Sequence, residues 1–370
     1  MYSPSHASQF FTFLVKFFCS FRLQLKIVTL YALYFFLNRR VVLKNPMRSI
    51  KTSNGITLSY QDCGNRHAPA IILIMGLGAQ MTVWPDELYF GLVDRGFRVI
   101  RFDNRDTGLS SHLDEHGTPN LFKTWLRRKV PFGKQAPYSL EDMADDVLAL
   151  MKALKIKKAH LVGASMGGMI AQILAAKQRK KVLSLTSIMS NSNNQLISGK
   201  SLGVLIKLAR LTPRNNSPQA AISYNVRLNQ LIGSPAYPRD EQTLREQATM
   251  HISRAHNPAG FKRQLAAITA SGDRRHLLTR IKAPTLVIHG THDPIFPLTA
   301  GQQTAAEIRK ARLKVVEGLG HDFPPILMGK MAKWIAKHVK KAELKRLKKK
   351  QKKKSETRKE IKLSVQEKTP

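Results

Sequence analysis

Residues 159–174 read AHLVGASMGGMIAQIL, and this stretch decides how the rest of the chain is interpreted. The apolar run before Gly163 has the length of a strand, and the small and apolar residues after Gly167 take up helical spacing. The Gly-x-Ser-x-Gly pattern between them is typical of a sharp strand-to-helix turn, which projects the Ser165 hydroxyl from the carboxyl end of the strand. The glycines let the chain fold back tightly. An ordinary glycine-rich turn is the alternative, and the surrounding sequence must decide between the two.

The acid and the base that a serine nucleophile needs follow it in chain order. Asp293 comes after the apolar run 284–289, and His321 comes after the run 313–316. Because parallel strands end at one edge of a sheet, we expect both side chains near Ser165. His321 would then take the hydroxyl proton, and Asp293 would hold the imidazole in one tautomer. The competitors in these loops are His292 and His289 for the base and Asp322 for the acid.

Backbone N–H groups are expected to stabilise the oxyanion of an acyl-transfer reaction, where one donor is worth about 3–4 kcal/mol. The N–H of Met166 directly follows the serine, and the N–H of Leu77 lies in the loop after the first buried strand. Gly76 lets this loop approach a substrate closely. Trp84 is expected to pack in the core, with a place in the lining of the pocket as the alternative.

Strand and helix patterns alternate along most of the chain, which predicts an α/β fold with a mostly parallel sheet and helices on both faces. A helix is predicted over 139–154, opened by a serine cap. The predicted strands are a hairpin over 50–60 and the runs 70–75, 97–102, 161–162, 182–188, 284–289 and 313–316.

Between residues 191 and 278 the strand pattern disappears, and we expect helices over 202–211, 219–231, 240–251 and 258–269. A helical cap over the site is the preferred interpretation, and a set of surface helices on one side is the alternative. The predicted division is an N-terminal segment (1–46), two parts of a hydrolase core (47–190 and 280–341), the cap (191–279) and a tail (342–370). After Pro325 a last helix should close the core with Ile326, Met331, Trp334, Ile335 and Val339.

Residues 10–37 are apolar but contain Lys16, Arg22 and Lys26. The longest uncharged run, 27–37, is shorter than the ~20 residues that a spanning helix requires. An interfacial helix therefore fits as well as a distorted span, and the basic residues that follow would place a catalytic domain on the cytoplasmic side. The alternative is a start at Met47, which would give a soluble cytoplasmic protein.

The formal net charge of the 370 residues is +37, which favours an anionic neighbour such as a lipid surface, nucleic acid or another polyanion. An ordinary solvated basic surface is the alternative, and an anionic membrane surface is the partner that we expect. The Lys-rich tail contains no aromatic residue, so we expect a disordered or helical solvated segment and no specific recognition of nucleic acid. Only Cys19 and Cys63 are present, which supports neither a disulfide framework nor a cysteine metal site.

Five motifs occur in the order typical of one family: LIMGLGAQMTVWPDEL, VIRFDNRDTGLS, GASMGG, VIHGTHDPIFP and GLGHDFP. Together they resemble the α/β-hydrolase superfamily, and within it the aclacinomycin methylesterase-like hydrolases, over residues 49–341. The resemblance implies an eight-stranded sheet, a cap, and hydrolysis of a carboxylic ester without a metal or cofactor. It also implies a structural role for the turn that holds Asp103, Arg105, Asp106 and Gly108. Met75 departs from the family, which usually has His before the oxyanion glycine.

These observations predict a membrane-associated serine hydrolase that acts on a small-molecule or lipid-like ester. A serine at position 165 argues against dehalogenase and epoxide hydrolase chemistry, which use aspartate there in this fold. Thioesterase, amidase, C–C hydrolase and perhydrolase activities stay open as alternatives. A non-catalytic binding module on the same fold is the alternative from a different class.

Overall fold

The computed structural model describes residues 46–127, 136–192 and 217–366. The chain divides into two compact units between residues 47 and 48, and all described helices and strands belong to the second unit. The apolar segment 10–37 and the predicted helix 202–211 lie outside the described residues.

Eight strands form one sheet in the order β1-β2-β4-β3-β5-β6-β7-β8, which confirms the predicted fold class. The pairs β1–β2 and β2–β4 are antiparallel, and all other neighbours are parallel. The strands are β1 (Arg48–Lys51), β2 (Thr57–Cys63), β3 (Ala70–Ile74), β4 (Arg98–Phe102), β5 (Ala159–Ala164), β6 (Val182–Ile188), β7 (Thr285–Gly290) and β8 (Ala311–Val316).

The central strand β3 is buried along its whole length, as expected for a parallel strand covered on both faces. Ile72 and Ile74 belong to one hydrophobic core, whereas Ile71 and Leu73 belong to the other, because successive side chains point to opposite faces.

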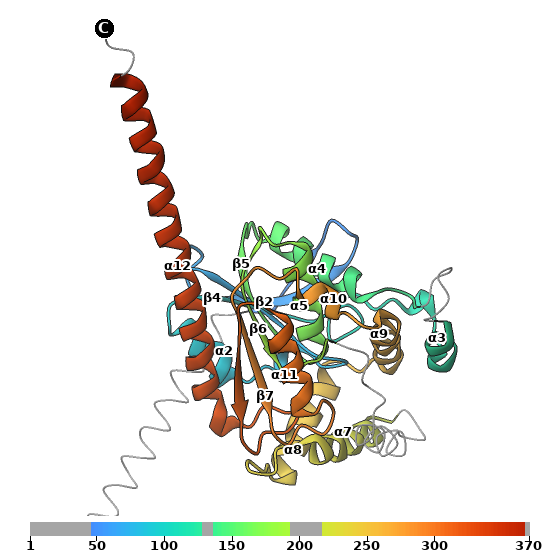
Figure 1. The fold of residues 1–370 in the computed structure, drawn as a ribbon. Coiled ribbons are helices and arrows are strands. Elements are labelled where there is room, and N and C mark those ends of the chain that lie inside the picture. Colours follow the sequence, from blue (N-terminus) through green and yellow to red (C-terminus); the bar gives the residue numbers. More distant parts are fainter. Residues whose placement is uncertain (1–45, 128–135, 193–216, 367–370) are drawn as a thin grey trace, which may run out of the picture. The chain divides into compact units, whose positions relative to one another are not determined.

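Helices cover both faces of the sheet (Figure 1). The first core is completed mainly by α4 (Leu140–Ala153), α5 (Met166–Lys177), α10 (Arg275–Leu278) and α11 (Leu298–Glu307). Helix α4 begins at a capping box, in which Ser139 and Asp142 exchange side-chain and backbone hydrogen bonds. The second core lies under α2 (Asp86–Val93) and α12 (Pro325–Gln366).

The described residues between β6 and β7 contain four helices and no strand. These are α7 (Pro218–Ile232), α8 (Glu241–Arg254), α9 (Pro258–Ser271) and the short α10. A further helix, α3 (Leu121–Arg127), packs against α9. Short 3₁₀ turns occupy Met81–Val83 and Asp114–His116.

Helix α12 runs without interruption from the core into the Lys-rich segment. The prediction that Ile326 closes the core is wrong, because its side chain is 75% exposed while Leu327 and Met328 are buried. Ile326 lies in the first turn of α12 on its exposed side, and the next two residues face inward. No helix in the described part of the chain is long and apolar enough to cross a membrane.

Candidate active site

Ser165 lies at the junction of β5 and α5 in a backbone conformation that side-chain-bearing residues rarely adopt, with φ +53° and ψ −120°. The turn is possible because the residues two positions before and after Ser165 are glycines. A Cβ on Gly163 would lie 2.2 Å from the Gly167 carbonyl oxygen, and a Cβ on Gly167 would lie 2.0 Å from the Ile74 carbonyl oxygen. Both contacts are impossible, so the two glycines let the start of α5 rest on β3 and β5.

The structure brings Ser165, His321 and Asp293 together from the ends of three strands. His321 Nε2 lies 3.0 Å from Ser165 Oγ, and His321 Nδ1 lies 2.8 Å from Asp293 Oδ2. These are hydrogen-bond distances on both sides of one imidazole. If Nδ1 carries the proton, Nε2 is free to accept one from the serine hydroxyl.

The Asp293 carboxylate is held by its own loop. Its Oδ1 accepts hydrogen bonds of 2.9 Å from the N–H groups of Ile295 and Phe296, and its side chain is completely buried. The Phe296 ring then meets the His321 ring edge-on, with centroids 5.6 Å apart. The loop after β7 therefore fixes the carboxylate and the imidazole in one geometry.

The competing residues have other partners. His292 is largely exposed, and its Nδ1 lies 2.9 Å from Thr291 Oγ1. His289 is buried, which lowers the pKa of its imidazole, and its Nε2 contacts the Phe296 carbonyl oxygen at 2.8 Å. The same Nε2 lies 3.6 Å from Asp293 Oδ2, farther than the 2.8 Å of His321 Nδ1.

Asp322 points away from the imidazole of the preceding residue. It accepts a hydrogen bond from Ser234 and pairs with Arg239 at 3.2 Å, on the side of α7 and α8. Burial raises the pKa of the Asp322 carboxyl group. The Ser234 hydroxyl also accepts the Gly320 N–H at 2.8 Å, so this cluster fastens the His321 loop to the helices above it.

The two backbone groups predicted to bind an oxyanion lie beside Ser165. A Cβ on Gly76 would lie 3.1 Å from the Ser165 Cβ, which places the loop after β3 directly against the serine. Met166 is the first residue of α5, so its N–H has no acceptor within the helix. Among the described contacts, neither this N–H nor that of Leu77 donates a hydrogen bond.

Trp84 is fully buried in the core under α12, where its ring centroid lies 5.1 Å from that of Phe323. Of the two roles considered for this residue, its burial favours packing in the core.

Helix α9 reaches the loop after β3 through Gln264, which the sequence did not single out. Its side-chain oxygen accepts the Gly78 N–H at 2.8 Å, and its amide nitrogen donates to the Arg105 carbonyl oxygen at 2.7 Å. The side chain is fully buried. One glutamine therefore connects the loop beside Leu77 with the turn after β4.

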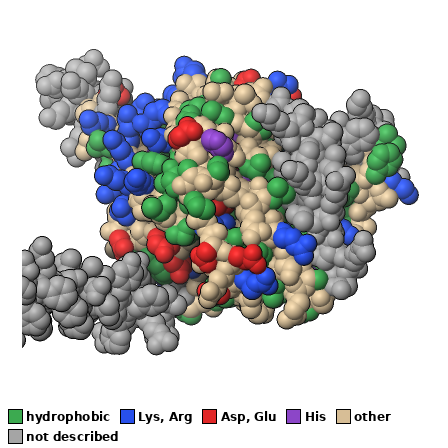
Figure 2. Space-filling model, turned by 90° about the horizontal axis from the view of Figure 1, so that it is seen from below, with side chains coloured by type: hydrophobic (Ala, Val, Ile, Leu, Met, Phe, Trp, Pro, Cys, Tyr) green, Lys and Arg blue, Asp and Glu red, His purple; other side chains and the backbone are tan. Residues whose placement is uncertain are grey.

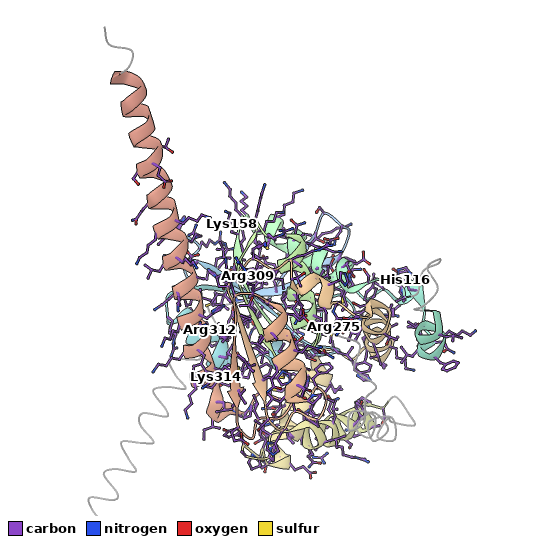
Figure 3. All side chains as sticks on the ribbon, viewed as in Figure 1. His116, Lys158, Arg275, Arg309, Arg312 and Lys314 are labelled. Atoms are coloured by element: carbon purple, nitrogen blue, oxygen red, sulfur yellow. The ribbon has the colours of Figure 1, made fainter. Side chains whose placement is uncertain are left out.

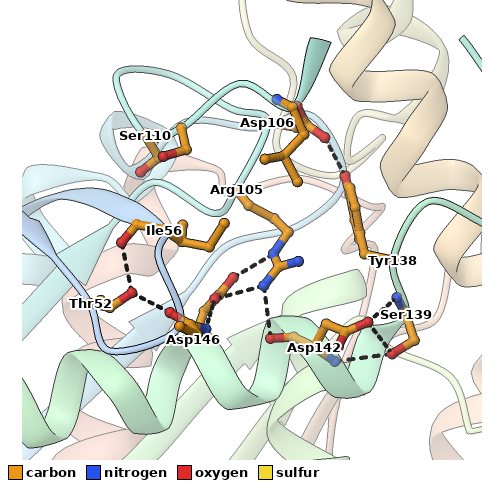
Figure 4. A network of polar contacts seen from close by, with 12 residues as sticks. Thr52, Ile56, Arg105, Asp106, Ser110, Tyr138, Ser139, Asp142 and Asp146 are labelled. Atoms are coloured by element: carbon orange, nitrogen blue, oxygen red, sulfur yellow. Dashed lines mark hydrogen bonds and ion pairs between the residues drawn. The ribbon is translucent and has the colours of Figure 1, made fainter. Parts of the chain in front are cut away.

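The turn after β4 is fastened by buried ion pairs (Figure 4). Arg105 contacts both carboxylate oxygens of Asp146 on α4, at 2.6 and 2.7 Å. Asp106 accepts hydrogen bonds from Tyr138 at 2.8 Å and from Arg263 at 2.7 and 2.9 Å. Burial raises the pKa of the Asp106 carboxyl group, but these hydrogen bonds outweigh it, and the pKa lies below its usual value.

A third pair joins the same turn to α8. Asp103 accepts the Met81 N–H at 2.7 Å and pairs with Arg254 at 2.6 Å. The sequence indicated the turn but not its partners on α8 and α9. The one available signal was the pair of acids Asp103 and Asp106, which require cations if the turn is buried, and Arg105 alone could not supply both.

Residues 69–324 match the family described as the alpha/beta hydrolase fold. The chain is 26% identical over 317 residues to the rhodomycin D methylesterase of Streptomyces peucetius, with 80% of this chain and 99% of that protein covered. It is 25% identical over 268 residues to 3-oxoadipate enol-lactonase 1 of Acinetobacter baylyi, with 72% and 88% covered.

A solved structure of a hydrolase from Pseudomonas aeruginosa is similar with a TM-score of 0.59 and 26% identity, and covers 78% of this chain and 98% of its own. The enol-lactonase of Burkholderia xenovorans has a TM-score of 0.61 at 24% identity, which supports the fold alone. The family match spans well over half of the sequence and includes strands β3 to β8 of the described sheet. This chain therefore belongs to the alpha/beta hydrolase fold family.

Proposed function

We propose that this protein is a serine hydrolase that cleaves a carboxylic ester through an acyl-enzyme on Ser165. The observation that carries the proposal is the contact of one imidazole with two partners: His321 lies 3.0 Å from the Ser165 hydroxyl and 2.8 Å from the Asp293 carboxylate. The methylesterase and the enol-lactonase among its relatives are both named for the cleavage of esters, which supports this substrate class.

In the proposed reaction, His321 Nε2 takes the hydroxyl proton as Ser165 Oγ attacks the ester carbonyl carbon. The N–H groups of Leu77 and Met166 stabilise the resulting oxyanion. Collapse of the tetrahedral intermediate breaks the bond to the alcohol oxygen, which receives the proton from His321. Water then gives a proton to His321 and attacks the acyl group, and the carboxylic acid leaves as the serine regains its proton.

A fluorophosphonate probe and a panel of p-nitrophenyl esters of graded chain length test this proposal. Labelling and hydrolysis should both be lost in Ser165→Ala and in His321→Ala, by about 10⁴-fold or more in kcat. Thioesters, amides and lactones tested beside the esters would identify the bond that is cleaved.

The matched control is His292→Ala, because His292 lies in a neighbouring loop but contacts Thr291 instead of the serine. This variant should retain hydrolysis. Labelling that survives Ser165→Ala, or hydrolysis that is lost in His292→Ala and retained in His321→Ala, would contradict the assignment.

We further propose that the protein associates with an anionic membrane surface from the cytoplasmic side. The apolar residues 10–37 and the Lys-rich part of α12 support this, because an apolar segment and a basic segment together give stable attachment. A basic residue near anionic lipid contributes about 1 kcal/mol.

Cell fractionation tests this second proposal. The full chain should be recovered with membranes, and a variant restricted to residues 47–347 should be recovered in the soluble fraction. Ending at residue 347 keeps the contact between Glu343 and His160, which anchors α12 to β5. Equal recovery of both proteins with membranes would contradict attachment through the termini.

A further inference from the structure

A pocket of about 440 Å³ lies at the amino ends of the central strands, at the opposite end of the sheet from Ser165. The segments that enter β3, β4 and β5 form most of its wall, and α12 closes one side. Its charged lining consists of one acid, Glu343, and six bases, which are Arg66, Arg98, Lys155, Lys157, Lys158 and Arg346.

Two of the six bases already have partners. Arg98 forms a two-pronged contact with Asp62, at 2.7 and 2.9 Å. Arg346 pairs with Glu343 at 2.6 Å, and this arginine offsets the only negative charge in the lining. The Glu343 carboxylate stays ionised, because a hydrogen bond from His160 lowers its pKa to about 2.

The other four bases, Arg66, Lys155, Lys157 and Lys158, are exposed, and their side chains form no ion pair or hydrogen bond with any described residue. Four like charges around a concave surface repel one another, and the walls concentrate their field in the pocket. Such a group of cations is stabilised by an anion of high charge.

Lys155 has a backbone conformation that is unfavourable for a lysine. The residue follows α4 with φ +57°, while the Ile156 N–H donates to the Met151 carbonyl oxygen at 2.7 Å. Glycine is the favoured residue at such a helix end, and any other residue is disfavoured by about 1 kcal/mol. A lysine at this position keeps a positive charge on the wall of the pocket.

The pocket belongs to a wider basic edge. The loops that enter the six parallel-paired strands β3 to β8 contain twelve Lys and Arg residues and one acid, Asp94. In Figure 3, Lys158 and Arg309 lie toward the amino end of the sheet, which is the end past which α12 extends. These loops expose no Phe, Tyr or Trp side chain on which a nucleic-acid base could stack.

We propose that this pocket binds a phosphate-bearing group, carried either by a soluble phosphate ester or by the headgroup of an anionic lipid. Lysine ammonium groups bind phosphate as point charges and do not need the planar geometry that a carboxylate offers to arginine. The six residues of β5 separate Lys158 from Ser165 by about 20 Å. The pocket is therefore distinct from the proposed ester site, and the inference does not depend on that function.

Isothermal titration of the full-length protein with inorganic pyrophosphate tests the proposal. The pocket variant Lys155→Gln/Lys157→Gln/Lys158→Gln should bind pyrophosphate about tenfold or more weakly than the wild type, since it removes three of the four unpaired charges. The matched control Lys282→Gln/Arg309→Gln/Lys310→Gln removes three charges from the same edge, outside the pocket, and should retain most of the affinity.

Arg66→Gln provides an independent variant from the loop before β3, in case the triple change disturbs folding. It should also weaken pyrophosphate binding. Ser165→Ala should bind pyrophosphate as the wild type does, so the loss of hydrolysis and the loss of phosphate binding are separate results.

Co-sedimentation with vesicles distinguishes the two sources of the phosphate group. Weaker binding of the pocket variant than of the control to vesicles of phosphatidylcholine and phosphatidic acid assigns the pocket to a lipid headgroup. Equal vesicle binding, together with the expected loss of pyrophosphate binding, assigns it to a soluble phosphate ester. If pyrophosphate does not bind, or if both triple variants lose it equally, the proposal is wrong.

Discussion

The two ends of the central sheet differ in how their charged side chains are paired. At the carboxyl end, four acids in the loops after the strands are buried, and each has a defined partner: His321 for Asp293, Arg254 for Asp103, Arg263 for Asp106 and Arg239 for Asp322. At the amino end, bases dominate and most are exposed. Seen from below, most of the visible Asp and Glu side chains lie in a band across the lower part of the described surface, while Lys and Arg gather mainly at the left (Figure 2).

This difference separates charges that fix geometry from charges that remain available to a ligand. A buried pair is costly to desolvate and is strongly disrupted when one partner is removed. An exposed base contributes little to stability. Substitutions at the carboxyl end should therefore change catalysis or folding, and substitutions at the amino end should change neither.

The largest expected effect is that of Asp293→Asn. The amide nitrogen would favour the wrong imidazole tautomer, so kcat for a p-nitrophenyl ester should fall by about 10⁴-fold while the fold is retained. Steady-state kinetics and circular dichroism measure the two quantities. A fall of less than about tenfold would mean that Asp293 does not orient His321.

Arg263→Met should cost about 3–5 kcal/mol of unfolding free energy, because it leaves Asp106 buried without its cation. Urea unfolding measures this change. The double variant Arg263→Met/Asp106→Asn should recover part of the loss, since it removes the unpaired charge. An undiminished loss in the double variant would show that packing of the arginine, and not its charge, is what matters.

Acid should destabilise the protein through His338, which lies on α12 between the two ends of the sheet. Burial, and next the Arg312 guanidinium, lower the pKa of His338 to about 4. Its Nε2 donates to the Leu185 carbonyl oxygen at 3.1 Å, so the folded protein holds the neutral ring. The unfolded chain gains a proton at about pH 6.5.

Stability should therefore be complete above about pH 6.5 and fall by up to about 3 kcal/mol as the pH decreases to about 4. Urea unfolding at several pH values measures the slope. His338→Gln keeps a donor for Leu185 but does not titrate, so its slope should be smaller. The same slope in both proteins would assign the acid sensitivity to other groups.

Gln264→Leu tests whether α9 controls the loop beside Ser165. The Gly78 N–H would lose its acceptor, and the loop that holds the N–H of Leu77 would lose this support. We expect a decrease in kcat of about tenfold with little change in KM, because an oxyanion donor such as Leu77 acts in the transition state. Gln264→Glu keeps the acceptor for Gly78 and should retain more activity. An increase in KM alone would indicate a role in substrate binding instead.

The smallest expected effect is at the amino end. Arg309→Gln/Lys310→Gln should change the unfolding free energy by less than about 0.5 kcal/mol and leave ester hydrolysis unchanged. Thermal unfolding and kinetics at low ionic strength provide the measurement. A clear loss of activity would show that the amino end of the sheet also affects catalysis.

The strands and their order along the chain could be predicted because local pattern decides them. The continuous apolar run of β3 and the glycines around Ser165 each impose one conformation. The places of Asp293 and His321 follow from the rule that parallel strands end at one edge.

The partners on α8 and α9 could not be predicted, because Gln264 and Gly78 are 186 residues apart and nothing local in the sequence links them. The extent of α12 is also a result of tertiary structure. Its Lys-rich part would repel itself as an isolated helix, but it continues a helix that the core and the contact of Glu343 with His160 already hold in place.

Strand β5 joins both ends of the molecule, since Lys158 precedes it and Ser165 follows it. A protein that rested on a negatively charged layer by its lysine-lined end would hold the serine about 20 Å above that layer, facing water. Esters dissolved in the surrounding liquid would reach the hydroxyl directly, whereas acyl chains buried in the layer would not. The direction of β5 would thus decide that the substrate reaches Ser165 from water and not from the layer.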